Sequence, residues 1–160
     1  MRPLLTVLTA AALLAPAIVA AQPLRLQVDA WRKQHERQIL DEAFALLAIP
    51  NVASNQDDIA KNVAFLSQAF ATRGVALTPL RAPTGGSPAL FGELKTPGAT
   101  RTVVFYAHYD GQPVAGGGWE SEPFVPKLSR YRNSAPTEDV PLPAPGDTVD
   151  PEVRIRARRK

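Results

Sequence analysis

The spacing of apolar residues along the chain predicts two helices in its first half. From about Val28 to Ala48, apolar residues recur every three or four positions on one face and charged residues occupy another, which is typical of an amphipathic helix. A second helix is predicted to start at Ser54 and Asp57, which resemble a capping box, and to end at Gly74. Both helices are half apolar, so we expect them to cover a sheet.

Three shorter apolar stretches after these helices predict strands. Residues 75–80 and 89–94 are the first two, and the third is the run Val103 to Ala107. This last run has no charge, a β-branched pair and two aromatic residues, which is typical of a strand buried on both faces. The order of the elements favours a mixed α/β fold over a helical bundle.

The predicted buried strand ends at His108, and Asp110 follows two residues later. Ligands bind at the carboxyl ends of strands in open α/β sheets. An imidazole is a common metal ligand, and a neighbouring carboxylate can hydrogen-bond the ring nitrogen that the metal does not use. Gly111 is predicted to allow a sharp turn. On spacing alone, the alternative is a strand-ending turn with a partly exposed histidine.

The stretch FYAHYDGQPV, followed by Trp119 and by Pro123 to Pro126, resembles the first metal-ligand region of the co-catalytic zinc exopeptidases. These include carnosinase-like dipeptidases, aminoacylases, glutamate carboxypeptidases and succinyl-diaminopimelate desuccinylases, and the likeness is closest to the dipeptidases. It extends upstream through FGELKTPGATRT to the helix that contains Trp31. The resemblance implies that His108 binds zinc and that Asp110 is the catalytic carboxylate that steers it.

The resemblance also implies an activity and a cofactor. Family members hydrolyse amide bonds of dipeptides or N-acyl amino acids with two Zn²⁺ ions in a complete site, of which this chain would hold at most one partial site. They supply further ligands from a second segment and from a Glu-Glu pair. Here Val153 to Arg158 resembles the run-up to that second segment, but Arg159 and Lys160 depart from its pattern.

We therefore expect the front part of a mixed-sheet peptidase catalytic domain, over residues 22–133, cut before the second metal ligand. Such a chain would be inactive alone, and the complete enzyme would be a possible homodimer. The edges of an incomplete sheet also predict poor solubility.

Residues 1–21 have the pattern of a secretory signal peptide, with a basic start, an apolar core and a small-residue exit. They predict export to the periplasm or beyond, with membrane contact only during export. The chain has no cysteine, so its stability must come from a packed core, and any zinc must be held by nitrogen and oxygen ligands.

The segment 134–160 is predicted to be a proline-rich loop and a basic tail. Its acids, among them Asp139 and Asp150, are expected to be solvated. The last seven residues carry five positive charges, and without these the formal net charge of +3 becomes −2. A nucleic-acid-binding tail is not favoured, because the tail has no interleaved aromatic residues and the chain is predicted to be exported.

Three other residues have a candidate role. His35 is interpreted as a helix-surface residue, since it has no acidic or histidine neighbour that would form a metal pair. Trp119 and Phe124 either line a substrate cleft or pin their loop to the body, and we favour pinning. The alternative function depends on this loop, from Trp119 to Pro126: an exported, non-catalytic module that binds a partner.

Overall fold

A computed structural model describes residues 23–116, 118–119 and 121–156. Helices α1 (Leu24–Leu47) and α2 (Gln56–Ala71) precede two small antiparallel sheets, so the prediction of a mixed α/β class is confirmed. The predicted signal peptide and the last four residues lie outside the described residues. In the described part of the chain, no helix has the length and apolar character needed to span a membrane.

Helix α2 begins one residue later than predicted. Its N-cap is Asn55, whose side-chain oxygen accepts a hydrogen bond from the backbone N–H of Asp58 at 3.3 Å. Ser54 is therefore not the cap. The buried side chain of Asn62 donates to the carbonyl oxygen of Pro50 at 2.8 Å and holds α2 against the linker that follows α1. As predicted, the helix is followed by Gly74 with a positive φ of 76°.

An ion pair joins helix α1 to the residue that follows the C-cap of helix α2. The guanidinium of Arg73 contacts both carboxylate oxygens of Glu42, at 2.8 and 2.5 Å. This hydrogen bond lowers the pKa of Glu42. An apolar groove of about 310 Å³ lies beside the pair, between α1 and α2. Its apolar lining consists of Ile39, Ala43, Leu46, Phe65, Leu66, Ala69 and Phe70.

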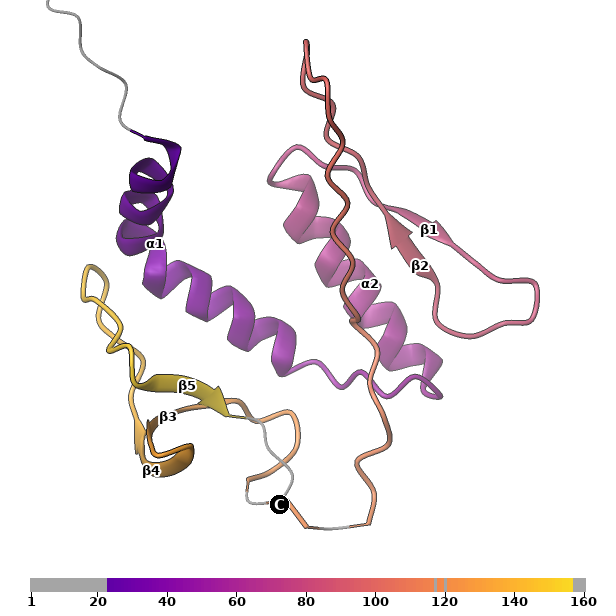
Figure 1. Cartoon of the computed structure of the whole chain (residues 1–160). Coiled ribbons are helices and arrows are strands. Elements are labelled where there is room, and N and C mark those ends of the chain that lie inside the picture. Colours follow the sequence, from indigo (N-terminus) through magenta and orange to yellow (C-terminus); the bar gives the residue numbers. More distant parts are fainter. Residues whose placement is uncertain (1–22, 117, 120, 157–160) are drawn as a thin grey trace, which may run out of the picture.

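The first sheet is a short hairpin of β1 (Thr78–Leu80) and β2 (Ala89–Phe91). Thr78 lies opposite Phe91 and Leu80 lies opposite Ala89. Both strands fall within the predicted stretches but are shorter than predicted. In Figure 1 this hairpin lies beyond α2, away from the second sheet.

The second sheet contradicts the prediction that residues 134–160 form only a loop and a tail. Strands β3 (Lys127–Arg132), β4 (Ala135–Val140) and β5 (Val153–Arg156) pair antiparallel in the order β4-β3-β5. Asn133 and Ser134 alone connect β3 to β4, with positive φ angles of 52° and 65°. Two left-handed residues are the signature of the tight hairpin turn whose twist matches that of the flanking strands. This turn explains why a segment with little apolar content forms strands.

Asp139 lies in strand β4, so the prediction that it is a loop acid is wrong, although its side chain is exposed as expected. Its carboxylate accepts hydrogen bonds from the hydroxyl of Ser129 at 2.7 Å and from Lys127 at 3.1 Å. Arg156 of β5 contacts the same carboxylate at 2.9 Å. Ser129 and its neighbour Leu128 are buried, so this carboxylate ties all three strands at the centre of the sheet.

Helix α1 holds the chain that leads into β5. The carboxylate of Glu36, which also pairs with Arg32, accepts a hydrogen bond from the backbone N–H of Val149 at 2.6 Å. The neighbouring Arg37 donates to the carbonyl oxygen of Pro143 at 2.8 Å. Glu36 is only 6% exposed as a result, although the sequence pattern placed it on the polar face of the helix.

The run Val103 to Ala107 is not a buried strand, which contradicts the central prediction. It is extended but unpaired, and its backbone makes no hydrogen bond to the backbone of another described residue. Val104 is 84% and Phe105 is 92% exposed. The physical reason is that no described strand lies beside this run to pair with it. In Figure 1 it forms part of the long trace without arrows that leaves β2.

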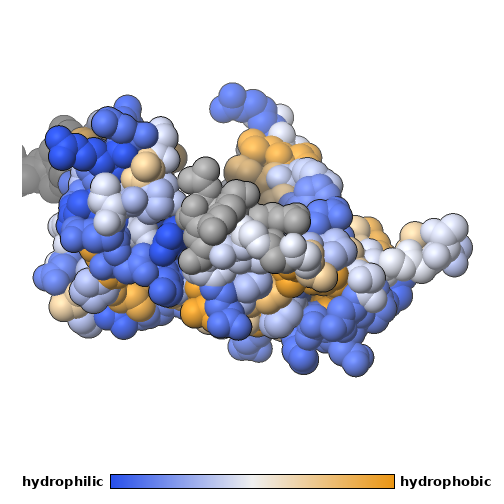
Figure 2. Space-filling view, turned by 90° about the horizontal axis from the view of Figure 1, so that it is seen from below, coloured by the Kyte–Doolittle hydropathy of each residue, from blue (hydrophilic) through white to orange (hydrophobic). Residues whose placement is uncertain are grey.

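The prediction that the two helices cover a sheet is also wrong for the described residues. Among the described elements, the extensive backbone contacts are those between paired strands. The buried apolar residues of the described chain are Ile59 in α2, Pro88 before β2 and Leu128 in β3. Figure 2 shows the consequence from one side, where apolar surface interrupts the polar surface in several places.

Candidate metal-ligand turn

The two residues proposed for metal chemistry lie side by side, directly after the exposed run. The ring nitrogen Nδ1 of His108 is 3.1 Å from Oδ1 of Asp110. Its other nitrogen, Nε2, is 3.1 Å from the hydroxyl of Tyr106. The His108 side chain is 72% exposed and that of Asp110 is 31% exposed. The pair is therefore open to solvent on the histidine side.

The Asp110 contact determines which nitrogen of His108 carries the proton. An ionised carboxylate only accepts hydrogen bonds, so Nδ1 of the neutral ring is the donor. Nε2 then keeps its lone pair and accepts from the Tyr106 hydroxyl. A carboxylate orients metal-bound histidines in this way, but here the Tyr106 hydroxyl contacts Nε2 and would have to turn away before a metal could bind there.

The turn that carries Asp110 is anchored to the linker between α1 and α2. Gly111 N–H donates to the carbonyl oxygen of Asn51 at 2.7 Å, and the Gly111 carbonyl oxygen accepts from Ala53 at 2.9 Å. The side chain of Asn51 donates to the carbonyl oxygen of Tyr109 at 2.8 Å. Together with a parallel bridge between Val52 and Gly111, these contacts fix the backbone on either side of Asp110.

Gly111 serves this anchoring and not a left-handed turn, because its φ is not positive. A Cβ atom at this position would lie 2.8 Å from Oδ1 of Asn51. That distance is shorter than real Cβ contacts, so only glycine permits this approach. The prediction that Gly111 frees the backbone to turn is therefore corrected: the residue makes room for a neighbour.

Tyr109 adds a second anchor between the two candidate residues. Its hydroxyl donates to the carbonyl oxygen of Pro88 at 2.5 Å, which ties the turn to the residue before β2. Burial raises the pKa of the Tyr109 hydroxyl, and the negative charge of Asp110 raises it further. The hydroxyl therefore stays protonated and acts as a donor.

The described residues fit one metal ligand and its orienting carboxylate, and they do not fit a complete catalytic zinc site. Such a site has about three protein ligands and an open position. Within residues 23–116, 118–119 and 121–156, no three His, Asp or Glu side chains are gathered where they could hold a metal ion. The prediction of Zn²⁺ stays a prediction.

The other candidate residues lie apart from this turn. His35 stacks on Trp31 with ring centroids 4.3 Å apart, and its Nδ1 is 2.7 Å from the Trp31 carbonyl oxygen. Trp119 donates from its indole nitrogen to the carbonyl oxygen of Val114 at 3.0 Å, so it is tied to its own loop. Phe124 is half buried and has a positive φ of 60°. The binding-module alternative gains no specific support from these contacts.

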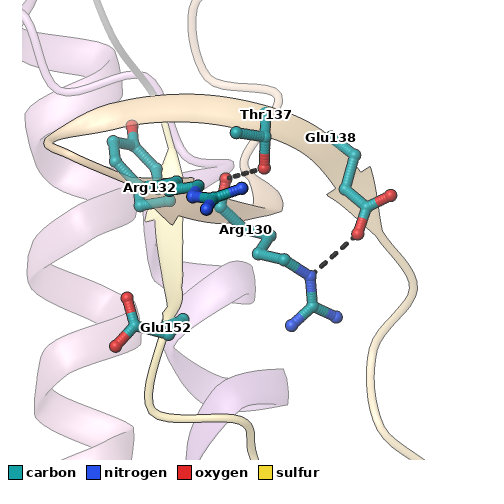
Figure 3. A pocket seen from close by; sticks show the side chains of 6 residues that line it. Arg130, Arg132, Thr137, Glu138 and Glu152 are labelled. Carbon is teal, nitrogen blue, oxygen red and sulfur yellow. Dashed lines mark hydrogen bonds and ion pairs between the residues drawn. The ribbon is translucent and has the colours of Figure 1, made fainter.

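A separate cavity of about 500 Å³ lies on the second sheet and contains none of the predicted site residues. Figure 3 shows two interactions among its lining residues: Arg130 pairs with Glu138 at 2.8 Å, and Thr137 donates to the Arg130 carbonyl oxygen at 3.2 Å. Arg130 also pairs with Asp150, so Asp150 is no free loop acid either. The lining residues are Arg130, Tyr131, Arg132, Thr137, Glu138 and Glu152.

Sequence reasoning missed the residues that position the turn, above all Asn51 and Tyr109. Asn51 directly follows the proline after α1, and no local pattern in the sequence shows that it contacts a segment nearly sixty residues later. In comparisons with known proteins, no protein-family model, no curated protein and no solved structure matches the chain.

Proposed function

We propose that residues 102–114 are the first metal-ligand segment of a metal-dependent hydrolase that cleaves amide bonds of small peptides or N-acyl amino acids. The observation that carries this proposal is the contact of 3.1 Å between Nδ1 of His108 and Asp110, which assigns the ligand role to Nε2. The Tyr106 hydroxyl, which is 3.1 Å from Nε2, would give way to the metal. The resemblance to co-catalytic zinc exopeptidases supports the same assignment on the residues FYAHYDGQPV.

Each residue of the segment has a distinct task in this proposal. His108 binds the metal through Nε2. Asp110 keeps the proton on Nδ1 and holds the ring in place, and the anchored backbone of Gly111 holds Asp110. When bound, the metal would polarise the amide carbonyl and lower the pKa of a water molecule to near 7. Its other ligands would come from residues outside the described part of the chain or from another polypeptide.

Zinc titration followed by NMR of the two histidine rings tests this assignment directly. The chain has two histidines, so His35 is an internal reference for non-specific binding. We expect the His108 ring signals to shift with added Zn²⁺ and those of His35 to stay in place. Equal shifts at both rings, or none at His108, would contradict the assignment.

Matched variants separate the ligand from the residue that orients it. H108A should abolish the response and H35A should leave it unchanged. D110N should weaken zinc binding by about 10- to 100-fold, because outer partners of metal-bound histidines contribute on that order. Hydrolysis of a dipeptide and N-acyl amino acid panel is measured on the complete enzyme that the resemblance implies, because this chain would hold at most a partial site. In that enzyme H108A is expected to abolish activity.

A further inference from the structure

Both ring nitrogens of His108 are engaged within the turn. The carboxylate of Asp110 contacts Nδ1 and the hydroxyl of Tyr106 contacts Nε2, each at 3.1 Å. The rings of Tyr106 and His108 meet edge to face, with centroids 5.4 Å apart and an interplanar angle of 75°. The three side chains therefore form one short chain of hydrogen bonds, although the His108 side chain is 72% exposed.

The Tyr106 hydroxyl and a metal ion need the same lone pair of His108. A neutral imidazole has one acceptor nitrogen, and with the proton on Nδ1 this nitrogen is Nε2. A Zn²⁺ ion binds a histidine nitrogen at about 2.0 to 2.1 Å. An oxygen atom that lies 3.1 Å from the nitrogen and donates to its lone pair leaves no room for that ion. Tyr106 and the metal are therefore alternative partners of Nε2.

The two ends of this chain of hydrogen bonds are held with different firmness. At the Asp110 end, both backbone groups of Gly111 are hydrogen-bonded to the linker between α1 and α2. The Tyr106 side chain is 83% exposed, and His108 is the hydrogen-bond partner of its hydroxyl. Tyr106 can therefore turn away by rotation of its side chain while Asp110 stays in place.

We propose that the contact of Tyr106 with His108 is autoinhibitory: the hydroxyl competes with the metal for Nε2 and so sets the metal concentration at which this ligand is occupied. The hydrogen bond must be broken before the metal binds, so it lowers the affinity of His108 for the metal. This inference rests on the proposed function, because it takes Nε2 of His108 as the ligand nitrogen.

Zinc titration of matched tyrosine variants measures the competition. Y106F removes the hydroxyl and keeps the ring. It should bind Zn²⁺ at His108 about 2- to 10-fold more tightly than the wild type, because one exposed hydrogen bond no longer has to be broken. Y131F, on the second sheet, is the matched control and should bind as the wild type does. The affinities are read from the NMR shifts of the His108 ring, with the His35 ring as the internal reference.

A second variant separates the hydroxyl from the bulk of the ring. Y106A should bind zinc as tightly as Y106F, because the competing atom is the hydroxyl oxygen. Tighter binding in Y106A alone would overturn the role of the hydroxyl, since the ring would then be the obstacle. Weaker binding in Y106F would also overturn it, since the hydroxyl would then be a ligand. Tyr106 is exposed, so we expect both variants to keep the far-ultraviolet circular dichroism spectrum of the wild type.

The release of Tyr106 has a signal of its own. With a chelator present, Y106F should change the chemical shift of Nε2 of His108, because that nitrogen loses its donor. When zinc is added to the wild type, the ring signals of Tyr106 should shift in step with those of His108. Equal zinc affinity of the wild type and Y106F would overturn the competition and leave the proposed function standing. Zinc binding at His108 in neither protein would overturn both.

Discussion

Two extended regions of this chain have opposite environments. In the second sheet, Ser129 is completely buried and β3 is hydrogen-bonded to a strand on each side. The run Val103 to Ala107 is more apolar and more typical of a strand, yet its side chains are exposed and it has no partner among the described residues. The difference shows that available partners, and not β propensity, decide which segments of this chain become strands.

The comparison predicts that the same truncation has very different costs in the two regions. L128A removes a side chain that is 4% exposed and should lower the free energy of unfolding by about 2 to 5 kcal/mol. F105A should change it by less than about 0.5 kcal/mol, as expected of exposed sites. Denaturant unfolding of each variant beside the wild type, at the same protein concentration, measures both losses. A larger loss in F105A than in L128A would show that the run is packed in solution.

The anchored turn is the border between the two regions, and G111A should loosen it. The added Cβ would lie 2.8 Å from Oδ1 of Asn51, so we expect a loss of about 1 to 3 kcal/mol. N51A removes that clash as well as the hydrogen bond to Tyr109. The double variant should therefore be less destabilised than the sum of the single variants. Additive losses would contradict the close approach of these two residues.

These contacts also show what the sequence can and cannot predict. The two helices follow from the spacing of residues within each helix, and Gly74 marks the end of the second, so local patterns suffice there. The second sheet was missed because its decisive features are a two-residue turn at Asn133 and Ser134 and ion pairs that join distant positions. The pairing of His108 with Asp110 is a local contact between alternate residues, whereas the anchors Asn51 and Pro88 are distant in sequence and carry no motif.

Helix α1 should stabilise the segment that leads into strand β5 of the second sheet. E36A removes the acceptor of the Val149 N–H and leaves that donor without its partner, which should cost about 1 to 3 kcal/mol. The segment from Pro143 to Val149 should then exchange its amide hydrogens faster, whereas amides of the exposed run should be unaffected. R25A, in the first turn of the same helix, is the control. Unchanged exchange at Val149 in E36A would contradict this role of Glu36.

The smallest effect should be a pH dependence confined to the second sheet. Hydrogen bonds from Ser129, and then from Lys127, lower the pKa of Asp139. A lowered pKa means that the folded state favours the ionised carboxylate. This contribution is therefore complete above the unfolded pKa of about 3.9 and is lost as the pH falls through the folded value.

D139N should consequently flatten the loss of stability on acidification below about pH 4. E93Q, an exposed carboxylate outside both sheets, is the control and should keep the wild-type profile. Because Asp139 is exposed, solvent screens these ion pairs and the change should be small. The exposed run has no carboxylate between Thr102 and Tyr109, so its exposure should not change over the acidic range in which the second sheet weakens. If both regions lost their structure at the same pH, they would form one cooperative unit and the contrast between them would not hold.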